Sequence, residues 1–276
     1  MFSRIYLHQL VFQERNSRMK VKFLLIGIVG LFVAGLLATS SYARIDPKTV
    51  VGMWSFDEGR DDVTADSSAN KNDGTLQNGP EWTEGQFGEA IQFDGADDYV
   101  DVGNADNLSI TGDFTFSLWL NISEYPTGWR NMLSKLVSDT NAEFNFRYKT
   151  STEGQFYYGT GGAAIVLAWN PSEDLPLDTW THVAGVRKSK EYMKLYFDGV
   201  EKRSLNITTD AISTDAHVTI GRQSDNKFYF DGSIDEVILF NVVLGEEDIQ
   251  TLMNEGIPQA VDPSGKLVST WAALRE

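Results

Sequence analysis

Three carboxylates stand at the beginning of an apolar segment near the end of the chain. Asp231, Asp235 and Glu236 precede the run Val-Ile-Leu-Phe, which ends at Phe240. A charged side chain that enters an apolar strand loses its hydration, and this is costly unless something compensates the charge. A bound divalent cation is one such compensation, because hard cations prefer carboxylate and carbonyl oxygens. This segment is therefore the first candidate for a functional site.

A second group of carboxylates lies between two apolar segments. The turn Asp94-Gly-Ala-Asp-Asp98 follows Ala90–Phe93, and its glycine lets the backbone curl so that carbonyl and carboxylate oxygens face one ion. Calcium takes six to eight such oxygens. The alternative is that Asp94 only forms the turn and that Asp235 accepts backbone hydrogen bonds. The candidate metal ligands are Asp57, Asp94 and Asp235, with Asp97, Asp98 and Asp231 as additional members.

The first 43 residues have the pattern of an export signal. Basic residues between Arg15 and Lys22 precede an apolar run from Phe23 to Ala38, and Ser41-Tyr-Ala43 offers a small-x-small cleavage site. Met19 heads a more ordinary signal than Met1 does, which makes Met19 an alternative start. An uncleaved membrane anchor is the other interpretation, because the run is close to the lower limit for a membrane span. We expect cleavage, and hence a secreted or cell-surface domain.

The chain is acidic and has no cysteine. Its formal net charge is −16, and without residues 1–43 it keeps 18 of its 23 basic and 38 of its 39 acidic residues. Such a surface repels nucleic acids and anionic membranes, so neither is expected as a partner. The excess of carboxylate suits a protein exported into a medium with divalent cations, although solubility alone would also explain it. Without disulfides, the fold must depend on a sizeable core.

From Val50 onward, short apolar segments alternate with turns rich in Gly, Asn, Asp and Pro, which is typical of a sandwich or barrel. Residues 114–121 alternate most clearly: every second side chain from Phe114 is apolar, and the opposite side is largely polar around Trp119. Asp198-Gly199 favours a tight hairpin, because both residues can adopt positive φ. Further strands are expected at residues 50–56, 90–93, 99–102, 132–136, 143–148, 155–158, 165–168, 180–187, 192–197, 218–221 and 234–240.

One helix is expected, at residues 246–254. Its first turn is acidic, which suits the helix dipole, and Ile249, Leu252 and Met253 form an apolar stripe that we expect to cover one edge of the sandwich. Residues 257–276 are expected to be a linker and a short tail, and whether the tail packs back onto the domain stays open. The sequence thus predicts one all-β domain, residues 44–256, with two antiparallel sheets and a short helix near the C-terminus.

In this order the segments resemble the laminin G-like, concanavalin A-like jelly-roll family of bacterial extracellular proteins. The resemblance spans residues 46–256 and rests on the order and spacing of short motifs. It implies a two-sheet antiparallel jelly roll that often binds calcium and commonly serves as a carbohydrate-binding or adhesion module. The matching segments are 51–59 (VGMWSFDEG), 66–68 (DSS), 72–80 (NDGTLQNGP), 88–103 (GEAIQFDGADDYVDVG), 114–120 (FTFSLWL), 180–183 (WTHV), 195–200 (LYFDGV) and 232–240 (GSIDEVILF).

The resemblance points to calcium held between the turn at Phe93–Gly95 and the strand start at Ile234–Asp235. No family motif fixes the ligand site. If the concave sheet binds sugar, aromatic faces and planar polar groups should line it, because sugar C–H faces stack on rings while hydroxyls need donors and acceptors. For each candidate, ordinary packing is the alternative. The candidates are Trp129, Arg130, Arg147, Tyr148, Tyr158, Trp169 and Arg222.

Catalysis is not expected. Glycosidases of the family that this sequence resembles carry the motif Glu-x-Asp-x-x-Glu or a close variant. Residues two apart on a strand share a face, and retaining enzymes need two carboxylates roughly 5–5.5 Å apart. The nearest pair here, Glu246 and Asp248, falls on the expected helix. Neither a Ser-His-Asp pattern, a phosphate-binding loop nor a zinc spacing is present.

These observations together predict an exported, calcium-dependent binding module for carbohydrate, such as a polysaccharide or cell-surface glycan. A protein-binding adhesion or surface-assembly module of the same fold is the first rival. The second rival is a glycosidase or lyase with unfamiliar acids.

Overall fold

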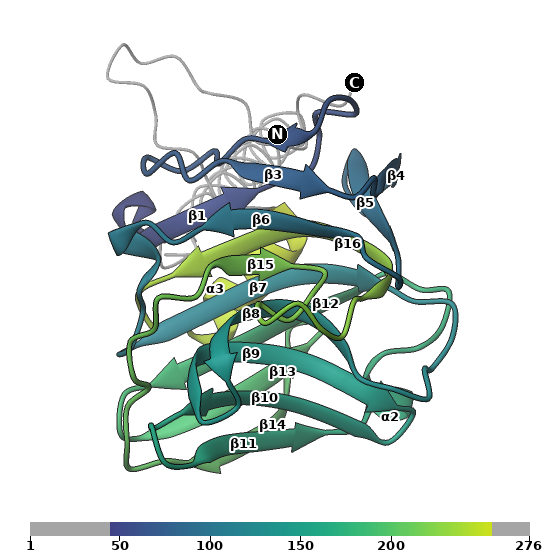
Figure 1. The fold of residues 1–276 in the computed structure, drawn as a ribbon. Helices are drawn as coiled ribbons and strands as arrows, with labels where there is room; N and C mark the ends of the chain where they lie inside the picture. Colours follow the sequence, from purple (N-terminus) through teal and green to yellow (C-terminus); the bar gives the residue numbers. More distant parts are fainter. Residues whose placement is uncertain (1–44, 256–276) are drawn as a thin grey trace, which may run out of the picture. The chain divides into compact units, whose positions relative to one another are not determined.

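A computed structural model describes residues 45–255, and in it two antiparallel sheets stack face to face (Figure 1). The first, called sheet A, has the order β14-β13-β12-β7-β16-β5-β4, and β1 also pairs with β16. Its strands are β1 (Val50–Trp54), β4 (Glu81–Glu84), β5 (Glu89–Asp94), β7 (Phe114–Asn121), β12 (Thr181–Lys188), β13 (Tyr192–Phe197), β14 (Val200–Asn206) and β16 (Asp231–Phe240).

The second sheet, called sheet B, has the order β11-β10-β9-β8-β15-β6-β3-β2. It forms the front layer in Figure 1. Strands far apart in the sequence are neighbours in both sheets, and the two-sheet antiparallel jelly-roll sandwich predicted from the sequence is confirmed. The strands of sheet B are β2 (Val63–Thr64), β3 (Gly74–Gln77), β6 (Tyr99–Gly103), β8 (Arg130–Ser138), β9 (Asn141–Thr150), β10 (Glu153–Gly159), β11 (Ala164–Trp169) and β15 (Val218–Ile220).

The main core lies between the two sheets. Phe114, Phe116, Leu118 and Leu120 of β7 point into it, as the alternation predicted. The ring of Phe114 stacks on Phe144 of β9 with 4.7 Å between centroids. Each large side chain buried here contributes about 1.5–3 kcal/mol relative to an exposed position, which is how a chain without disulfides holds the sandwich together.

A second apolar cluster covers the outer face of sheet A. Helix α3 (Glu246–Glu255) places Ile249 and Leu252 against Ile238 and Phe240 of β16. The helix was expected at this position in the chain, but its stripe covers a sheet face rather than an edge of the sandwich. The reason is that the outward side chains of β16 are themselves apolar and need cover from water.

Several elements escaped the sequence prediction because they are short or polar: β2, β3, β4, β14, the helix α2 (Pro171–Asp174) and the 3₁₀ turns η1 (Pro47–Thr49) and η2 (Asp106–Leu108). The predicted hairpin is confirmed, with φ of 49° at Asp198 and 73° at Gly199 between β13 and β14. The export signal and the tail lie outside the described residues. Among the described helices, none has the length and apolar character needed to cross a bilayer.

Candidate functional site

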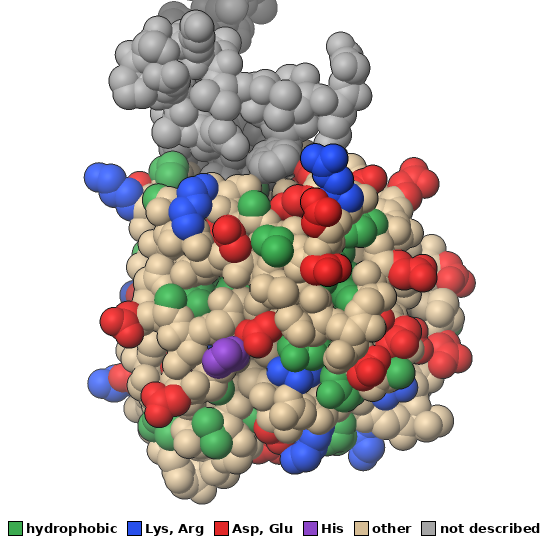
Figure 2. Space-filling model, turned by 45° about the horizontal axis from the view of Figure 1, so that its top comes forward, with side chains coloured by type: hydrophobic (Ala, Val, Ile, Leu, Met, Phe, Trp, Pro, Cys, Tyr) green, Lys and Arg blue, Asp and Glu red, His purple; other side chains and the backbone are tan. Residues whose placement is uncertain are grey.

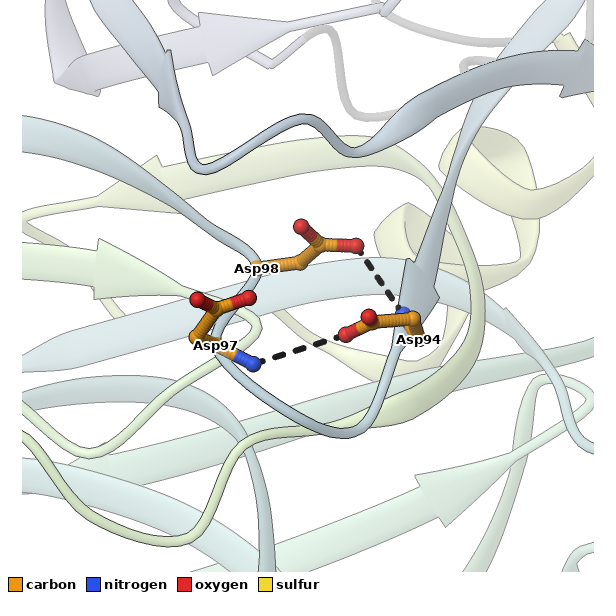
Figure 3. Close-up of side chains that lie close together, drawn as sticks. All are labelled: Asp94, Asp97 and Asp98. Atoms are coloured by element: carbon orange, nitrogen blue, oxygen red, sulfur yellow. Dashed lines mark hydrogen bonds between the residues drawn. The ribbon is translucent and has the colours of Figure 1, made fainter.

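The turn between β5 and β6 brings three carboxylates together. Oxygens of Asp94, Asp97 and Asp98 lie within 4.8 Å of one another (Figure 3). Asp94 Oδ1 accepts hydrogen bonds from the backbone of Ala96 (2.8 Å) and Asp97 (3.4 Å), and Asp98 Oδ2 accepts one from Asp94 N (3.1 Å). Burial raises the pKa of Asp98, and the charges of Asp94 and Asp97 add to this. The group has the spacing for a cation, but its bonds are also those of an ordinary Asx turn.

Asp231 faces this turn from the neighbouring strand. It is the register partner of Asp94 where β16 begins beside β5. A Cβ added at Gly95 would lie 2.8 Å from Asp231 Cβ, and the φ of Gly95 is +74°, so only glycine fits there. Burial raises the pKa of Asp231, an effect that the positive charge of Arg130 opposes. Asp231 thus belongs with the acidic turn.

Asp235 lies in a different place, inside sheet A opposite Trp119 of β7. It is fully buried. Its Oδ2 accepts a hydrogen bond from Phe87 N at 2.9 Å, whereas its buried Oδ1 has no hydrogen-bond partner. Burial raises its pKa to about 8, and the charges of Glu236 and Asp57 act in the same direction. Without a cation this carboxyl is therefore mostly protonated at neutral pH, and a bound cation would favour its ionised form.

Other carboxylates lie near Asp235, but among the described residues only Asp94, Asp97 and Asp98 place three carboxylate oxygens within 4.8 Å of one another. Asp57 follows β1, and its Oδ1 accepts a hydrogen bond from Glu89 N at 3.1 Å. One oxygen each of Glu58 and Glu89 is buried without a hydrogen-bond partner. A Cβ added at Gly59 would lie 2.0 Å from Glu89 Oε2, so the glycine makes room for this side chain. We call the set Asp57, Glu58, Glu89, Asp235 and Glu236 the buried carboxylate cluster.

The backbone is strained at two residues, one next to the buried carboxylate cluster and one within it. Phe56, just before Asp57, has φ of 56°, and Glu236, just after Asp235, has φ of 51°. Neither residue type favours this left-handed region. Such strain persists where the surrounding structure imposes it, often at functional sites. Here it coincides with a shift in the pairing of β16 with β7 between Asp235 and Ile238.

The two acidic groups are separate. Asp94 pairs with Asp231, and Asp235 lies four residues farther along β16, which is roughly 13 Å at the usual strand rise. Ligands on opposite sides of one calcium ion are only about 5 Å apart. The structure therefore does not bring Asp94 and Asp235 to a common ion, contrary to the arrangement expected from the sequence. Proximity favours the turn as a metal site, because it alone among the described residues brings three carboxylate oxygens within 4.8 Å of one another. Burial favours the carboxylate cluster, because Asp94 and Asp97 are exposed to water.

Three of the candidate ligand residues lie in the core. Tyr148, Tyr158 and Trp169 are 1%, 0% and 3% exposed. Their strands place them on the same side as Phe146 and Phe156, between the sheets, and Trp169 stacks on Phe146 with 5.3 Å between centroids. No ring face is left for a ligand. Aromatic character alone does not distinguish a core position from a surface position. The alternation of side chains along β9 and β10 does, because it places these residues on the core side.

The outer face of sheet B instead carries a stacked pair, Trp129 and Arg147. The guanidinium carbon of Arg147 lies 4.1 Å from the ring centroid of Trp129 and 4.6 Å from that of Tyr157. Trp129 is only half-buried, so part of its ring remains accessible. Planar amides lie beside the guanidinium, since Gln155 and Gln223 both accept hydrogen bonds from it. We call Trp129, Arg147, Tyr157, Gln155 and Gln223 the tryptophan platform.

Two buried amides extend the tryptophan platform beneath its surface. Asn131 Nδ2 donates to Asn145 Oδ1 at 2.6 Å, and the remaining amide atoms, Asn131 Oδ1 and Asn145 Nδ2, are buried without a partner. The sequence analysis missed both, together with Gln155, Gln223 and Tyr157. The alternation along β9 could have indicated this outer face, because Asn145 and Arg147 alternate with the core residues Phe144, Phe146 and Tyr148.

The other two basic candidates contact other groups: Arg130 Nη1 donates to the backbone carbonyl of Trp129 at 3.4 Å. Arg130 is the register partner of Tyr148, whose ring is in the core. The side chains of Arg130 and Asn131 therefore lie on opposite faces of β8, and the charge of Arg130 acts on Asp231. Arg222 lies flat on Tyr99, with its guanidinium carbon 3.4 Å from the ring centroid. Arg222 is 8% exposed and donates to Asn226.

Strand order, stacked antiparallel sheets and an outer helix define a jelly-roll domain. The chain belongs to the concanavalin A-like lectin/glucanases superfamily, whose laminin G-type model matches residues 94–250. This agrees with the resemblance drawn from the sequence. Among curated proteins, none matches this sequence.

Solved structures share the fold at low sequence identity. Domain 4 of AbnA, a GH43 extracellular arabinanase from Geobacillus stearothermophilus in complex with arabinotriose, has a TM-score of 0.57 and 19% identity over 75% of this chain and 98% of that chain. The binding domain of Paraclostridial Mosquitocidal Protein 1 has a TM-score of 0.61 and 15% identity over 75% and 52%. The botulinum neurotoxin serotype D ligand-binding domain in complex with N-acetylneuraminic acid has a TM-score of 0.59 and 18% identity, and the match covers 75% of this chain and 51% of that chain. The chain thus spans about half the length of the toxin domains.

Proposed function

We propose that this protein is a non-catalytic module that binds carbohydrate through the outer face of sheet B. The observation that carries the proposal is the tryptophan platform, a half-buried ring held flat on the guanidinium of Arg147. A ring fixed in this way offers an apolar face to the C–H face of a sugar without a further loss of side-chain freedom. The amides beside it offer the donors and acceptors that hydroxyl groups require.

The comparisons support a binding module of this kind. The arabinanase domain was solved with arabinotriose and spans nearly the same length as this domain, and a toxin domain was solved with N-acetylneuraminic acid. A toxin domain of the same fold was also solved with rat synaptotagmin II, which keeps protein binding as the rival function. Because the arabinanase is extracellular, we propose an extracytoplasmic location here too.

A non-catalytic role is supported by the one serine–histidine contact of the described residues. Ser117 Oγ lies 2.7 Å from His182 Nε2, but the two residues are 2% and 1% exposed. Burial lowers the pKa of His182 to about 3, so the imidazole stays neutral. A substrate cannot reach this pair, and its role is in packing beside Trp119.

We also propose that calcium binds at the buried carboxylate cluster and stabilises the domain. The support is the fully buried carboxylate of Asp235, one oxygen of which has no hydrogen-bond partner and which lies close to the charges of Glu236 and Asp57. Asp57 and Asp235 would supply carboxylate ligands to the ion, which would compensate their charge. The cluster links the end of β1, the hairpin of β4 and β5, and β16, so a bound ion would fix the N-terminal part of sheet A.

The experiment for the sugar-binding proposal is a glycan and polysaccharide array probed in saturating calcium. Binding that is lost in Trp129→Ala supports it. Trp82→Ala is the matched control, because Trp82 is also half-buried but lies on β4 at the edge of sheet A. Failure to bind any glycan, with capture of an extracellular protein that survives Trp129→Ala, would favour the rival.

A further inference from the structure

We infer that the tryptophan platform takes a neutral glycan and excludes uronate and sulfated polymers, an inference that rests on the proposed function. The observation behind it is that three basic side chains of this region are each bound to a carboxylate of their own. Arg147 pairs with Asp139 at 3.2 Å, Lys149 with Glu153 at 3.4 Å, and Lys227 with Asp225 at 2.8 Å.

Arg147 has no donor left for an anionic ligand. A guanidinium carries five N–H groups, and here they make five hydrogen bonds: Nε and Nη2 donate to Gln155, Nη1 donates to Gln223, and Nη1 and Nη2 donate to Asp139. Recognition of a carboxylate or sulfate by arginine normally uses two of these N–H groups side by side. Asp139 already occupies that position, and its pKa is lowered by the bonds from Tyr157 and Arg147 against the opposing effect of burial. Asp139 therefore stays ionised.

The other two cations cannot replace Arg147. Lys149 Nζ lies 5.5 Å from the Trp129 centroid and is shared with Glu153 four residues away. Hydrogen bonding to Asp225 raises the pKa of Lys227, so both partners carry charge and their charges cancel. An anionic sugar unit on Trp129 would meet the three carboxylates Asp139, Glu153 and Asp225 as well as the three cations.

The remaining arginines of this region do not change the balance of positive and negative charge at Trp129. Arg130 leaves β8 on the side of Tyr148 and Asp231. Arg222 packs on Tyr99 of β6, whereas its neighbour Gln223 reaches Arg147. Arg222 is 8% exposed, so it offers little surface to an anion.

The surface as a whole favours a neutral ligand as well. The chain carries −16, and acidic side chains crowd the right-hand margin of the view in Figure 2. A polyanion approaching this surface is repelled over about a Debye length, roughly 8–10 Å at physiological salt. A neutral polysaccharide meets no such barrier, and its hydroxyls can bond to the amides of the tryptophan platform.

The test compares two polymers that share one backbone and differ only in charge. Fully methyl-esterified homogalacturonan and its de-esterified form, polygalacturonate, are offered to the calcium-loaded protein together with arabinan, galactan and xylan. We expect binding to be confined to uncharged polymers, to disappear in Trp129→Ala, and to change less than twofold in Kd between about 50 and 500 mM NaCl. Tight binding of a uronate polymer through Trp129 would overturn the inference while leaving the proposed function intact. Absence of binding to every polymer would overturn both.

A second variant tests the charge argument directly. Asp139→Asn keeps the shape of the side chain but removes the charge that neutralises Arg147, so polygalacturonate should gain affinity by about tenfold or more, with a marked dependence on salt. Glu247→Gln is the matched control, because it makes the same change in net charge on α3, over sheet A. Equal gains in the two variants, or uronate binding that is lost in Arg222→Ala, would refute the assignment of neutrality to the ion pairs at Trp129.

Discussion

Asp235 of β16 and Phe87 of the β4–β5 hairpin are joined by a 2.9 Å hydrogen bond from the Phe87 backbone N–H to Asp235 Oδ2. The bond fixes the hairpin against the middle of sheet A and holds one oxygen of a fully buried carboxylate. The other oxygen has no hydrogen-bond partner. Ionising a buried and half-paired carboxyl is costly, which is why its pKa is raised to about 8, and a cation beside it would offset that cost. This relationship is the physical basis for expecting a cation at the buried carboxylate cluster.

Calcium should therefore raise the melting temperature of the purified domain, and a chelator should lower it. At a concentration a hundred times the Kd, a ligand that binds only the native state adds about 2.7 kcal/mol. For a domain of this size, 1 kcal/mol moves the melting temperature by about 2–4 °C, so we expect a shift of roughly 5–10 °C. Differential scanning calorimetry with calcium and with EGTA measures it.

Two variants locate the ion. In Asp235→Asn, the calcium-dependent shift should vanish, because the buried ligand loses its charge. In Asp94→Asn, the shift should remain, because Asp94 lies in the separate acidic turn. If calcium had no effect on the wild-type protein, or if Asp94→Asn abolished the shift and Asp235→Asn did not, the assignment to the buried cluster would be wrong.

Trp129→Ala should weaken glycan binding by about tenfold or more, since a central aromatic contact of this type is typically worth 2 kcal/mol or more. Its thermal stability should change little, because the ring is half-buried and the guanidinium on which it stacks keeps its five hydrogen bonds without it. Isothermal titration with the best array ligand measures the loss. Trp82→Ala should leave affinity unchanged; equal losses in both variants would mean that the effect is not specific to the platform.

The fold was predictable because its long strands carry strong local signals. Residues 114–121 alternate between core and outer face over the whole of β7, and Asp198-Gly199 needs positive φ at both positions, so each pattern has one structural solution. β14 and β4 lacked such a signal. Their side chains are largely polar, and they are strands because the adjoining hairpin and neighbouring strand pair with them, which is a tertiary effect.

The site was predicted less completely, for a related reason. Asp57 and Asp235 were chosen as candidate ligands because acidic residues beside apolar strands are unusual, but the register that separates Asp235 from Asp94 is set by the pairing of β16 with β5 and β7. Sequence order alone cannot supply that register. Tyr148 was assigned to ligand binding by residue type, whereas its neighbours Phe144 and Phe146 already placed it in the core.

His182 should make the domain sensitive to acid. Its pKa is lowered to about 3 in the folded state by burial, against about 6.5 when unfolded. Between these values the unfolded chain binds more protons, so stability falls as the pH drops from about 6.5 toward 3, by a few kcal/mol in total. His182→Gln should flatten this limb of the stability curve, measured by urea unfolding at several pH values. An unchanged slope would show that carboxylates alone govern it.

Glu143→Ala should be among the most destabilising single changes in the domain. Glu143 is fully buried, 3.8 Å from the equally buried Lys135, and it accepts hydrogen bonds from Ile110 N (2.6 Å), Thr214 N (3.0 Å) and Ser109 Oγ (3.1 Å). Removing one partner of a buried pair leaves an uncompensated charge, which costs about 3–5 kcal/mol. The double variant Lys135→Met with Glu143→Leu should recover part of this loss, because no charge is then left buried, although the backbone N–H groups of Ile110 and Thr214 lose their acceptor. Urea unfolding of the three proteins tests this: a Glu143→Ala midpoint equal to that of the wild type would show that water enters the site and satisfies Lys135.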